Sequence, residues 1–410
     1  MCPGEIDTIT LAGDALKIDY RTEVVENINV SHPAAVLIEQ TTKHIIGNQI
    51  VFALGYGRSG GTGVIDETGD FPDPYPAQTK QAILPTINIA GRMWLSDKAL
   101  KATRKAGAAA FYNLLERDLS NLQRDTKDLL ARMYQGSPNG KITTITAVGA
   151  YGTGVQALTI DAPFKLYEGQ SVDILDATPN PDAVIANGSD WRVLRVNTKT
   201  GVIHLQTTGT DINANIAANA DYIVLHGNLG KEMNGMDVVF TEGNTMYGLD
   251  KLLFPWFDPT VIDLAVGGAM GEIDELVLQQ AEDDVDRRTG ETLDAYLTTW
   301  GVRRAFFAYM SSMKMNTTPM KLRGGFEALD WKGKPFVVER YNPANTIRCL
   351  STKTWALNQM DDWDWMGGEG GGTLTKVANK PVWEASLIKY CDLSCDKPAA
   401  NVEIRSVAEH

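Results

Sequence analysis

Hydrophobic and polar residues alternate in short runs between residues 141 and 228, which is the pattern of half-buried β-strands. Turn residues such as Asn187-Gly188 and Lys199-Thr200-Gly201 separate the runs. The runs lie at residues 142–146, 157–160, 171–175, 191–196, 202–205 and 222–225. Their spacing predicts a small antiparallel barrel or sandwich, inserted into a chain whose other parts have a different character.

A helical pattern precedes this all-β region. Leu114, Leu122 and Leu129 recur at helical spacing among charged residues and predict an amphipathic helix over residues 108–134. The turn residues at 136–140 end it. At 1.5 Å per residue the helix would be roughly 40 Å long, which exceeds a typical globular helix. We expect it to serve as a stiff spine.

The segment before the long helix is rich in glycine and proline. Gly55, Gly57 and Gly60 follow a predicted strand at residues 51–54 and formally match the dinucleotide-binding fingerprint. That fingerprint also needs a helix immediately afterwards, and here glycines, acids and prolines follow, so we expect no nucleotide site. Residues 82–90 return to strand character. The segment therefore predicts a long, irregular two-stranded flap, which is marginal in water unless another surface covers it.

The two ends of the chain add shorter elements. Residues 1–54 predict an extended arm with a short helix at 34–38, for which Ser31 and Pro33 are the start signals. Mixed helical and strand patterns resume after residue 227, with a helix over residues 273–288. That helix is expected to carry Leu276, Val277, Gln280 and Val285 along one side. Short strands are expected at residues 335–338 and 402–404.

Composition and charge narrow the classes of function. The 410 residues are 43% hydrophobic, which is enough to fill two or three lobes. The formal net charge of −13 should repel nucleic acid at long range, so we expect no tight DNA binding by the whole surface. The sequence has no signal-like start and no run of roughly 18 apolar residues, so we expect a soluble protein without a membrane partner.

The candidate chemical groups do not combine into a site. Cys391 and Cys395 are close in sequence, but no His or further Cys lies near them to complete a zinc set. The acids at residues 282–286 would point in different directions on a helix, which favours a solvated face over a metal site. Trp363 and Trp365 are expected to be packed aromatic anchors rather than a sugar platform. We therefore predict no catalytic residue, no metal site and no cofactor.

Several short sequence segments follow one another in an order that is similar to the order in one protein family. These segments lie at residues 63–69 with 82–85, at 92–100, at 324–336, at 362–366 and at 395–400. In this order they resemble the two limbs of an E-loop, the strand-to-helix passage after it, the return between two domains, and the closing strands. The chain thus resembles the major capsid proteins of tailed bacteriophages, which have the Hong Kong 97-type fold. The resemblance covers nearly the whole chain except residues 141–226.

The resemblance implies an α+β capsid fold made of an N-terminal arm, an E-loop, a peripheral (P) domain with a long spine helix, and an axial (A) domain. The all-β region departs from the minimal fold and is expected to be an inserted domain. The implied segments are the N-terminal arm at 1–54, the E-loop at 55–92, the P-domain spine-helix region at 93–140, the inserted β-barrel or sandwich at 141–228, the A-domain at 229–334, and the return through the P-domain with the closing A-domain strands at 335–410.

The function implied by the resemblance is structural and not enzymatic. Copies of the chain would assemble as hexamers and pentamers into an icosahedral shell that encloses the DNA genome of a tailed phage. The implied partners are a scaffolding protein, a portal and a decoration protein, and the DNA would be enclosed without sequence-specific binding. The protein would be made and assembled in the cytoplasm of the host bacterium and would reside in the virion.

The flap provides candidate contact residues. An extended arm and a long flap bury little surface within their own chain, so neighbouring copies must stabilise them. We expect inter-subunit contacts at Glu67, Phe71, Tyr75 and Lys80 in the flap and at Arg92 at its base. Some E-loop lysines in related shells form covalent links to a neighbouring asparagine. Lys80 has no located Asn or nearby acid, so we do not predict a cross-link.

Two alternatives stay open at this point. An encapsulin-like nanocompartment has the same fold and would hold a cargo enzyme in place of a genome. A metal-dependent hydrolase or carbohydrate-binding protein would instead use the acid cluster and the tryptophans. Hollow shells or rings in electron microscopy favour the phage capsid or the nanocompartment, and a stable monomer contradicts both of these.

Overall fold

The computed structural model describes residues 32–43, 45–67, 69–98, 101, 114–152, 154–177, 182–206, 216, 218, 220–312, 320–321, 327–366 and 374–410. These residues form two compact units. Unit 1 spans residues 135–235, and unit 2 combines the described residues up to 134 with those from 236 onward. Parts of five predicted features lie outside the described residues: the arm before residue 32, residue 68 of the segment at 63–69, residues 99 and 100 of the segment at 92–100, the helix start at 108–113, and residues 324–326 of the segment at 324–336.

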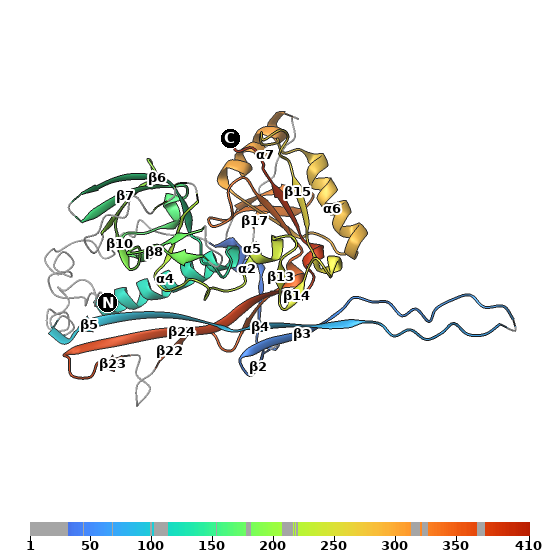
Figure 1. The fold of residues 1–410 in the computed structure, drawn as a ribbon, viewed down its shortest axis with the longest axis horizontal. Helices are drawn as coiled ribbons and strands as arrows, with labels where there is room; N and C mark the ends of the chain where they lie inside the picture. The colour runs from blue at the N-terminus through green and yellow to red at the C-terminus, as the bar shows by residue number, and fades with distance from the viewer. Residues whose placement is uncertain are drawn as a thin grey trace. The chain divides into compact units, whose positions relative to one another are not determined.

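Unit 1 is a small β-barrel (Figure 1). Its strands are β6 (Thr143–Gly152), β7 (Val155–Ile160), β8 (Ser171–Asp176), β9 (Ala183–Val184), β10 (Trp191–Asn197), β11 (Val202–Gln206) and β12 (Tyr222–Leu225). The order β10-β11-β7-β6-β12-β8 is closed by pairing between β8 and β10. Leu158, Ile174, Trp191 and Ile203 fill its interior. The all-β prediction is confirmed. β9 was not predicted, because its two exposed residues show no alternation.

A sheet and the long helix make up one part of unit 2. β5 (Ile87–Ser96) pairs along its whole length with β24 (Val382–Cys395). The sheet continues through β21 (Trp355–Gln359), β22 (Asp364–Trp365) and β23 (Thr375–Lys376), and β1 (Glu39–Thr41) runs parallel to β21. α4 (Leu114–Gln135), the described part of the predicted spine helix, lies against this sheet at Gly91 (Figure 1).

A smaller sheet carries the flap. It contains β2 (Ile45–Ile46), β3 (Gln49–Gly55) and β4 (Thr79–Pro85). Residues 56–78 continue beyond β3 and β4 as two limbs that run side by side (Figure 1). The single strand expected at 82–90 is in fact divided between β4 and β5 around Pro85 and Thr86. Because proline lacks an N–H group, a strand commonly ends there.

A second large sheet forms the main core of unit 2. Its order is β15 (Thr260–Asp263), β25 (Val402–Arg405), β20 (Ile347–Leu350), β16 (Ala295–Thr298), β19 (Lys334–Val338), β18 (Glu327–Trp331) and β17 (Met320–Lys321). α6 (Glu275–Thr289) and α7 (Trp300–Ser312) flank it (Figure 1). Phe306 of α7 stacks on Phe336 of β19 with ring centroids 4.7 Å apart. The shorter elements are α2 (Pro33–Leu37), α5 (Met236–Phe240), β13 (Thr245–Met246) and β14 (Leu249–Asp250).

The predicted helix at 273–288 is present as α6, but Leu276 does not share one side of it with Val285 as predicted. Leu276 is 77% exposed, whereas Leu278, Ala281 and Val285 are buried. The Asp274 side chain accepts a hydrogen bond from the Val277 N–H and fixes the start of the helix. At 3.6 residues per turn, Leu276 and Leu278 then point to opposite sides of the helix.

Candidate assembly surface

The two limbs of the flap approach each other too closely for a side chain at Gly57 or Gly60. A Cβ atom at Gly57 would lie 2.9 Å from the Gln78 backbone nitrogen. A Cβ atom at Gly60 would lie 3.0 Å from Tyr75 Cβ. Backbone hydrogen bonds join the limbs at the same places, since the Gly57 N–H donates to the Gln78 carbonyl and the Gly60 N–H to the Tyr75 carbonyl. Two of the three glycines that formally matched a nucleotide fingerprint, Gly57 and Gly60, therefore serve close pairing of the limbs, whereas a Cβ at Gly55 would meet nothing within 4 Å.

The far part of the flap exposes apolar side chains that nothing in its own chain covers among the described residues. Phe71 is 85% exposed and Tyr75 57%, and Val64 and Glu67 are also exposed. The Tyr75 hydroxyl accepts a hydrogen bond from Gln78 Nε2 at 3.1 Å. An exposed aromatic group on an extended hairpin is typical of a surface that another molecule covers.

Aromatic rings fix the root of the flap to the turn that follows β14. Tyr56 stacks on Trp256 with ring centroids 5.0 Å apart and planes only 4° from parallel. Phe254 meets both rings edge-on. Lys80 Nζ lies 5.3 Å from the centre of the Phe254 ring. Lys80, predicted as an inter-subunit contact, thus has an aromatic partner within its own chain, and its contact with a neighbour stays a prediction.

Arg92 also has partners in its own chain. Its guanidinium forms an ion pair with Glu384 of β24, and Arg92 Nε lies 3.1 Å from the carboxylate. The Trp94 indole N–H donates to the same carboxylate at 3.1 Å, and Arg92 Cζ lies 4.6 Å from the Trp94 ring centre. The side chain is nevertheless about half exposed, so a further contact has room.

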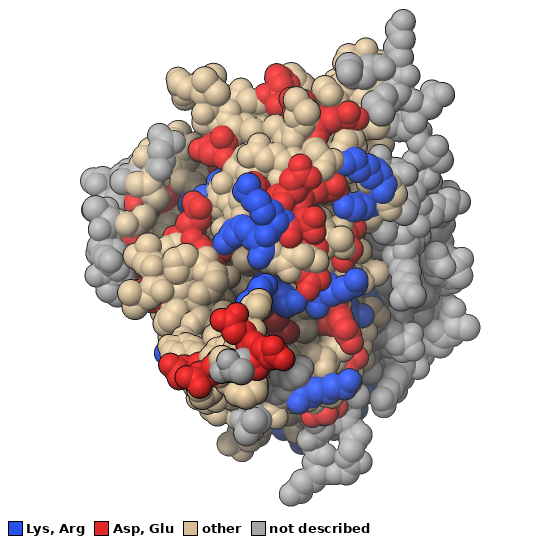
Figure 2. Space-filling view, turned by 90° about the vertical axis from the view of Figure 1, so that its right-hand side faces the viewer, with Lys and Arg blue, Asp and Glu red and all other residues tan. Residues whose placement is uncertain are grey.

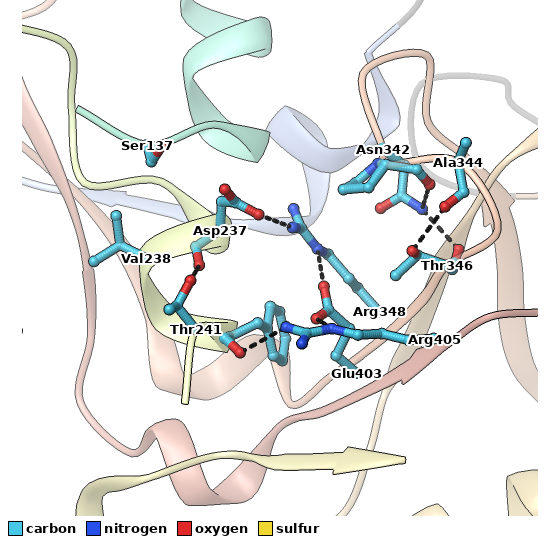
Figure 3. A network of polar contacts seen from close by, with 12 residues as sticks. Ser137, Asp237, Val238, Thr241, Asn342, Ala344, Thr346, Arg348, Glu403 and Arg405 are labelled. Carbon is cyan, nitrogen blue, oxygen red and sulfur yellow. Dashed lines mark hydrogen bonds and ion pairs between the residues drawn. The ribbon is translucent and has the colours of Figure 1, made fainter. Parts of the chain in front are cut away.

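A charged network holds α5 to the main sheet of unit 2 (Figure 3). The fully buried Arg348 of β20 pairs with Asp237 of α5 and with Glu403 of β25, each at 3.0 Å. Glu403 also accepts from Arg405, whose Nη2 donates to the Phe240 carbonyl at 3.0 Å. These pairs satisfy one another, so the network stabilises the fold and leaves no charged group poised for chemistry.

The acid cluster at 282–286 is occupied by charge partners. Glu282 lies 2.5 Å from Lys334 Nζ and 2.7 Å from the Tyr296 hydroxyl. Burial opposes ionisation, but hydrogen bonds from Lys334 and Tyr296 hold the pKa of Glu282 below its usual value. Asp284 pairs with Arg287 at 2.6 Å. Within the described residues no group of three or more His, Cys, Asp or Glu side chains could hold a metal ion.

The tryptophan turn after β21 is also engaged. Lys389 Nζ of β24 lies 5.3 Å from the Trp363 ring centre and 3.1 Å from Asp362. Trp365 is partly buried in β22. These contacts agree with packed anchors and give no flat platform for a sugar.

The charges on one face of the molecule are mixed. Figure 2 shows a face on which Lys and Arg side chains lie among Asp and Glu side chains and gather into no large patch of one sign. No helix in the described part of the chain is long and apolar enough to cross a membrane.

Sequence reasoning missed two groupings that the fold brings together. The first is the aromatic root of the flap, where Tyr56 meets residues about 200 positions later. The second joins His32 to Asp128 and Glu339. No local pattern indicates either, because each depends on pairing between distant segments.

Known proteins are similar to this chain in structure and not in sequence. No family model and no curated protein matches it. The capsid asymmetric unit of cyanophage A-1(L) superposes with a TM-score of 0.59 at 11% identity, covering 98% of this chain and 99% of that one. The capsid of a native GTA particle gives a TM-score of 0.51 at 10% identity, covering 98% and 100%. An encapsulin complex from Synechococcus elongatus gives a TM-score of 0.46 at 9% identity, covering 98% and 96%.

These likenesses extend over nearly the full length of both chains, so they concern the whole fold and not a shared fragment. At 10–11% identity they establish the fold alone. The chain therefore has the Hong Kong 97-type capsid fold that the order of its segments predicted, with a small β-barrel added.

Proposed function

We propose that this chain is the major capsid protein of a tailed bacteriophage and that its copies assemble into the icosahedral shell around the DNA genome. The observation that carries the proposal is an exposed apolar flap on a capsid fold. Phe71 and Val64 lie in water in the single chain, and a shell would cover them with a neighbouring copy. The role is structural, and no catalytic step is part of it.

The proposed contacts with neighbours are those of the flap. Glu67, Phe71 and Tyr75 are exposed and can reach another copy directly. Lys80 and Arg92 contribute mainly by fixing the root and base of the flap, since both have partners in their own chain. A stiff root matters because a flap held in one direction loses less conformational entropy when it docks.

The finer division of the fold also belongs to this proposal. The sheet of β5 and β24 with α4 corresponds to the P-domain, and the sheet of β16 and β20 with α6 and α7 to the A-domain. In the shell, copies would form hexamers and pentamers. A scaffolding protein, a portal and a decoration protein would be its partners in the host cytoplasm and the virion.

The relation to DNA follows from charge. A net charge of −13 and a mixed surface give packaged DNA few cationic clusters to bind, so the genome would be enclosed without sequence-specific contacts. Tight binding of free duplex to assembled particles at moderate salt would contradict this part of the proposal.

Electron microscopy and sedimentation of the purified full-length protein test the proposal. We expect closed shells of uniform size or hexamer and pentamer rings from the wild type. Phe71→Asp should yield folded but unassembled subunits, because it places a charge in the contact. Leu194→Asp is the matched control, since Leu194 is an exposed apolar residue of β10 outside the flap. A wild-type protein that stays monomeric at high concentration contradicts the proposal, and a single co-purifying enzyme supports the nanocompartment.

A further inference from the structure

His32 lies between two carboxylates from distant parts of unit 2. Its Nε2 is 2.8 Å from Asp128 of α4, and its Nδ1 is 3.6 Å from Glu339, which follows β19. The side chains are largely buried, with 13% exposure for His32, 17% for Asp128 and 1% for Glu339. The imidazole ring also stacks on Tyr341 at 5.7 Å. One ring therefore joins three segments that are far apart in the sequence.

The surrounding bonds favour the charged form of the ring. The Tyr341 hydroxyl donates to Asp128 at 2.7 Å, and the Ala34 N–H donates to Glu339 at 3.0 Å, so both carboxylates have fixed positions. Arg340 is a further charged neighbour and acts on Asp128. Loss of the charge between two largely buried carboxylates is costly, because it leaves them without their shared partner.

The pKa values agree with this geometry. Burial alone would lower the pKa of His32, but the nearby carboxylates of Asp128 and Glu339 raise it to about 9. In the same way, burial opposes ionisation of Asp128, while bonds from His32 and Tyr341 hold its pKa below the usual value. The ring is thus protonated at neutral pH.

The cluster holds the segment that begins at His32. This segment contains α2, whose Ala34 is buried, and β1, which pairs in parallel with β21 through Glu39, Gln40 and Thr41. β1 is short and meets its partner over three residue pairs. A three-residue parallel pairing is weak alone, so the segment depends on its buried residues Ala34 and Ile38 and on the anchor at its start.

We propose that His32, Asp128 and Glu339 form a charge latch that fastens residues 32–41 to α4 and to the main sheet, and that loss of the His32 proton to solvent releases this segment. The latch is a property of the single chain and goes beyond the proposed shell function. The charge of His32 would thus decide whether residues 32–41 stay fastened to the rest of unit 2.

Hydrogen exchange on the unassembled full-length protein tests the latch. Peptides covering residues 33–41 are followed by mass spectrometry from pH 6.5 to pH 10, with rates corrected for the intrinsic effect of pH. In the wild type, protection should fall at least tenfold as pH rises through about 9. A peptide covering β16 serves as the internal control, because its core position should show no such step.

Three variants separate the latch from a packing role. His32→Gln is neutral and should show low protection with no step. His32→Arg stays charged at every pH tested and should keep its protection above pH 9. Glu339→Gln removes one carboxylate and should move the step to lower pH. Lys43→Gln, an exposed change outside the cluster, should behave like the wild type.

These experiments test the latch independently of shell assembly. Equal protection in wild type and His32→Gln, or the same step in both, overturns the latch. A step that Glu339→Gln leaves unmoved overturns it as well, even where the arginine variant does not fold. Because subunits alone are measured, a negative result here leaves the capsid proposal untouched, and the reverse also holds.

Discussion

Gly91 of β5 lies directly against Thr126 of α4. A Cβ atom at Gly91 would come within 2.5 Å of Thr126 Cγ2 and 2.9 Å of Leu122 Cδ1. The long helix can therefore rest on the strand only because this position has no side chain. Thr126 is itself fixed, since its hydroxyl donates to the Leu122 carbonyl at 2.8 Å.

Gly91→Ala should lower the free energy of unfolding by about 1–3 kcal/mol, because the added methyl group forces the helix away from the sheet. Thr126→Ser removes the clashing methyl and keeps the hydroxyl, so it should recover part of that loss. Urea unfolding followed by circular dichroism measures both. Gly55→Ala is the control, since its Cβ would meet nothing within 4 Å. If Gly91→Ala lowers the free energy of unfolding equally in the wild-type and the Thr126→Ser backgrounds, the contact between Gly91 and Thr126 is unimportant.

The beginning of α7 depends on a residue near the end of the chain. Glu409 accepts hydrogen bonds from the Thr299 hydroxyl at 2.5 Å and from the Asn345 N–H at 3.0 Å. Its carboxylate occupies the space that a Cβ at Gly301 would need. A carboxylate at this end of a helix is favoured by the helix dipole.

A double-mutant cycle tests this arrangement. Gly301→Ala alone should cost about 1–2 kcal/mol of stability, because it displaces Glu409 from the helix end. In the Glu409→Gly background the same change should stabilise by about 0.5–1 kcal/mol, since alanine is the better helix former and neither the carboxylate nor the Cβ of Glu409 is left to displace. Thermal unfolding of the four proteins gives the comparison. If Gly301→Ala changes the stability in the same direction in both backgrounds, the arrangement is disproved.

Sequence patterns predicted those elements whose period is long and regular. The all-β unit and α4 were predicted because alternation and helical spacing continue over many residues. The predicted side of α6 was wrong at Leu276, because Leu276 and Val285 are nine residues apart and point to opposite sides of the helix, whereas Leu278, Ala281 and Val285 share the buried side.

The candidate surface was predictable only in outline. The exposure of Phe71 and Tyr75 follows from a flap rich in glycine and proline. The partner of Tyr56 does not, since Trp256 comes from a turn that only the folded chain brings near. Pairing between distant segments is set by the whole fold, and a single sequence carries no local signal for it.

The buried network around Arg348 should tolerate loss of its outer member better than loss of its centre. Arg348→Met leaves Glu403 without its buried partner and should cost about 3–5 kcal/mol. Arg405→Met removes a partner that is 41% exposed, so water can replace it and the cost should stay near 1 kcal/mol. Urea unfolding measures the two variants side by side. Equal losses would mean that Arg348 contributes packing rather than charge.

Stability should fall as pH rises from about 6.5 to about 9, and His32 should account for the fall. The folded-state pKa of His32 is raised to about 9 from its ordinary 6.5, so in this range the folded chain binds more protons than the unfolded chain. The contribution of the ring is therefore complete below pH 6.5 and lost above pH 9. Below the neutral range, protonation of Asp128, whose pKa is lowered, removes the partner and weakens the same cluster.

The difference in free energy of unfolding between wild type and His32→Gln isolates this contribution. We expect it to be about 1–2 kcal/mol at pH 6.5, because partial exposure screens the pair, and to vanish near pH 10. Denaturant unfolding at several pH values gives the curve. Lys43→Gln should run parallel to the wild type throughout, because Lys43 is exposed and lies outside the cluster. A difference that does not change with pH would assign His32 a packing role and remove charge from the explanation.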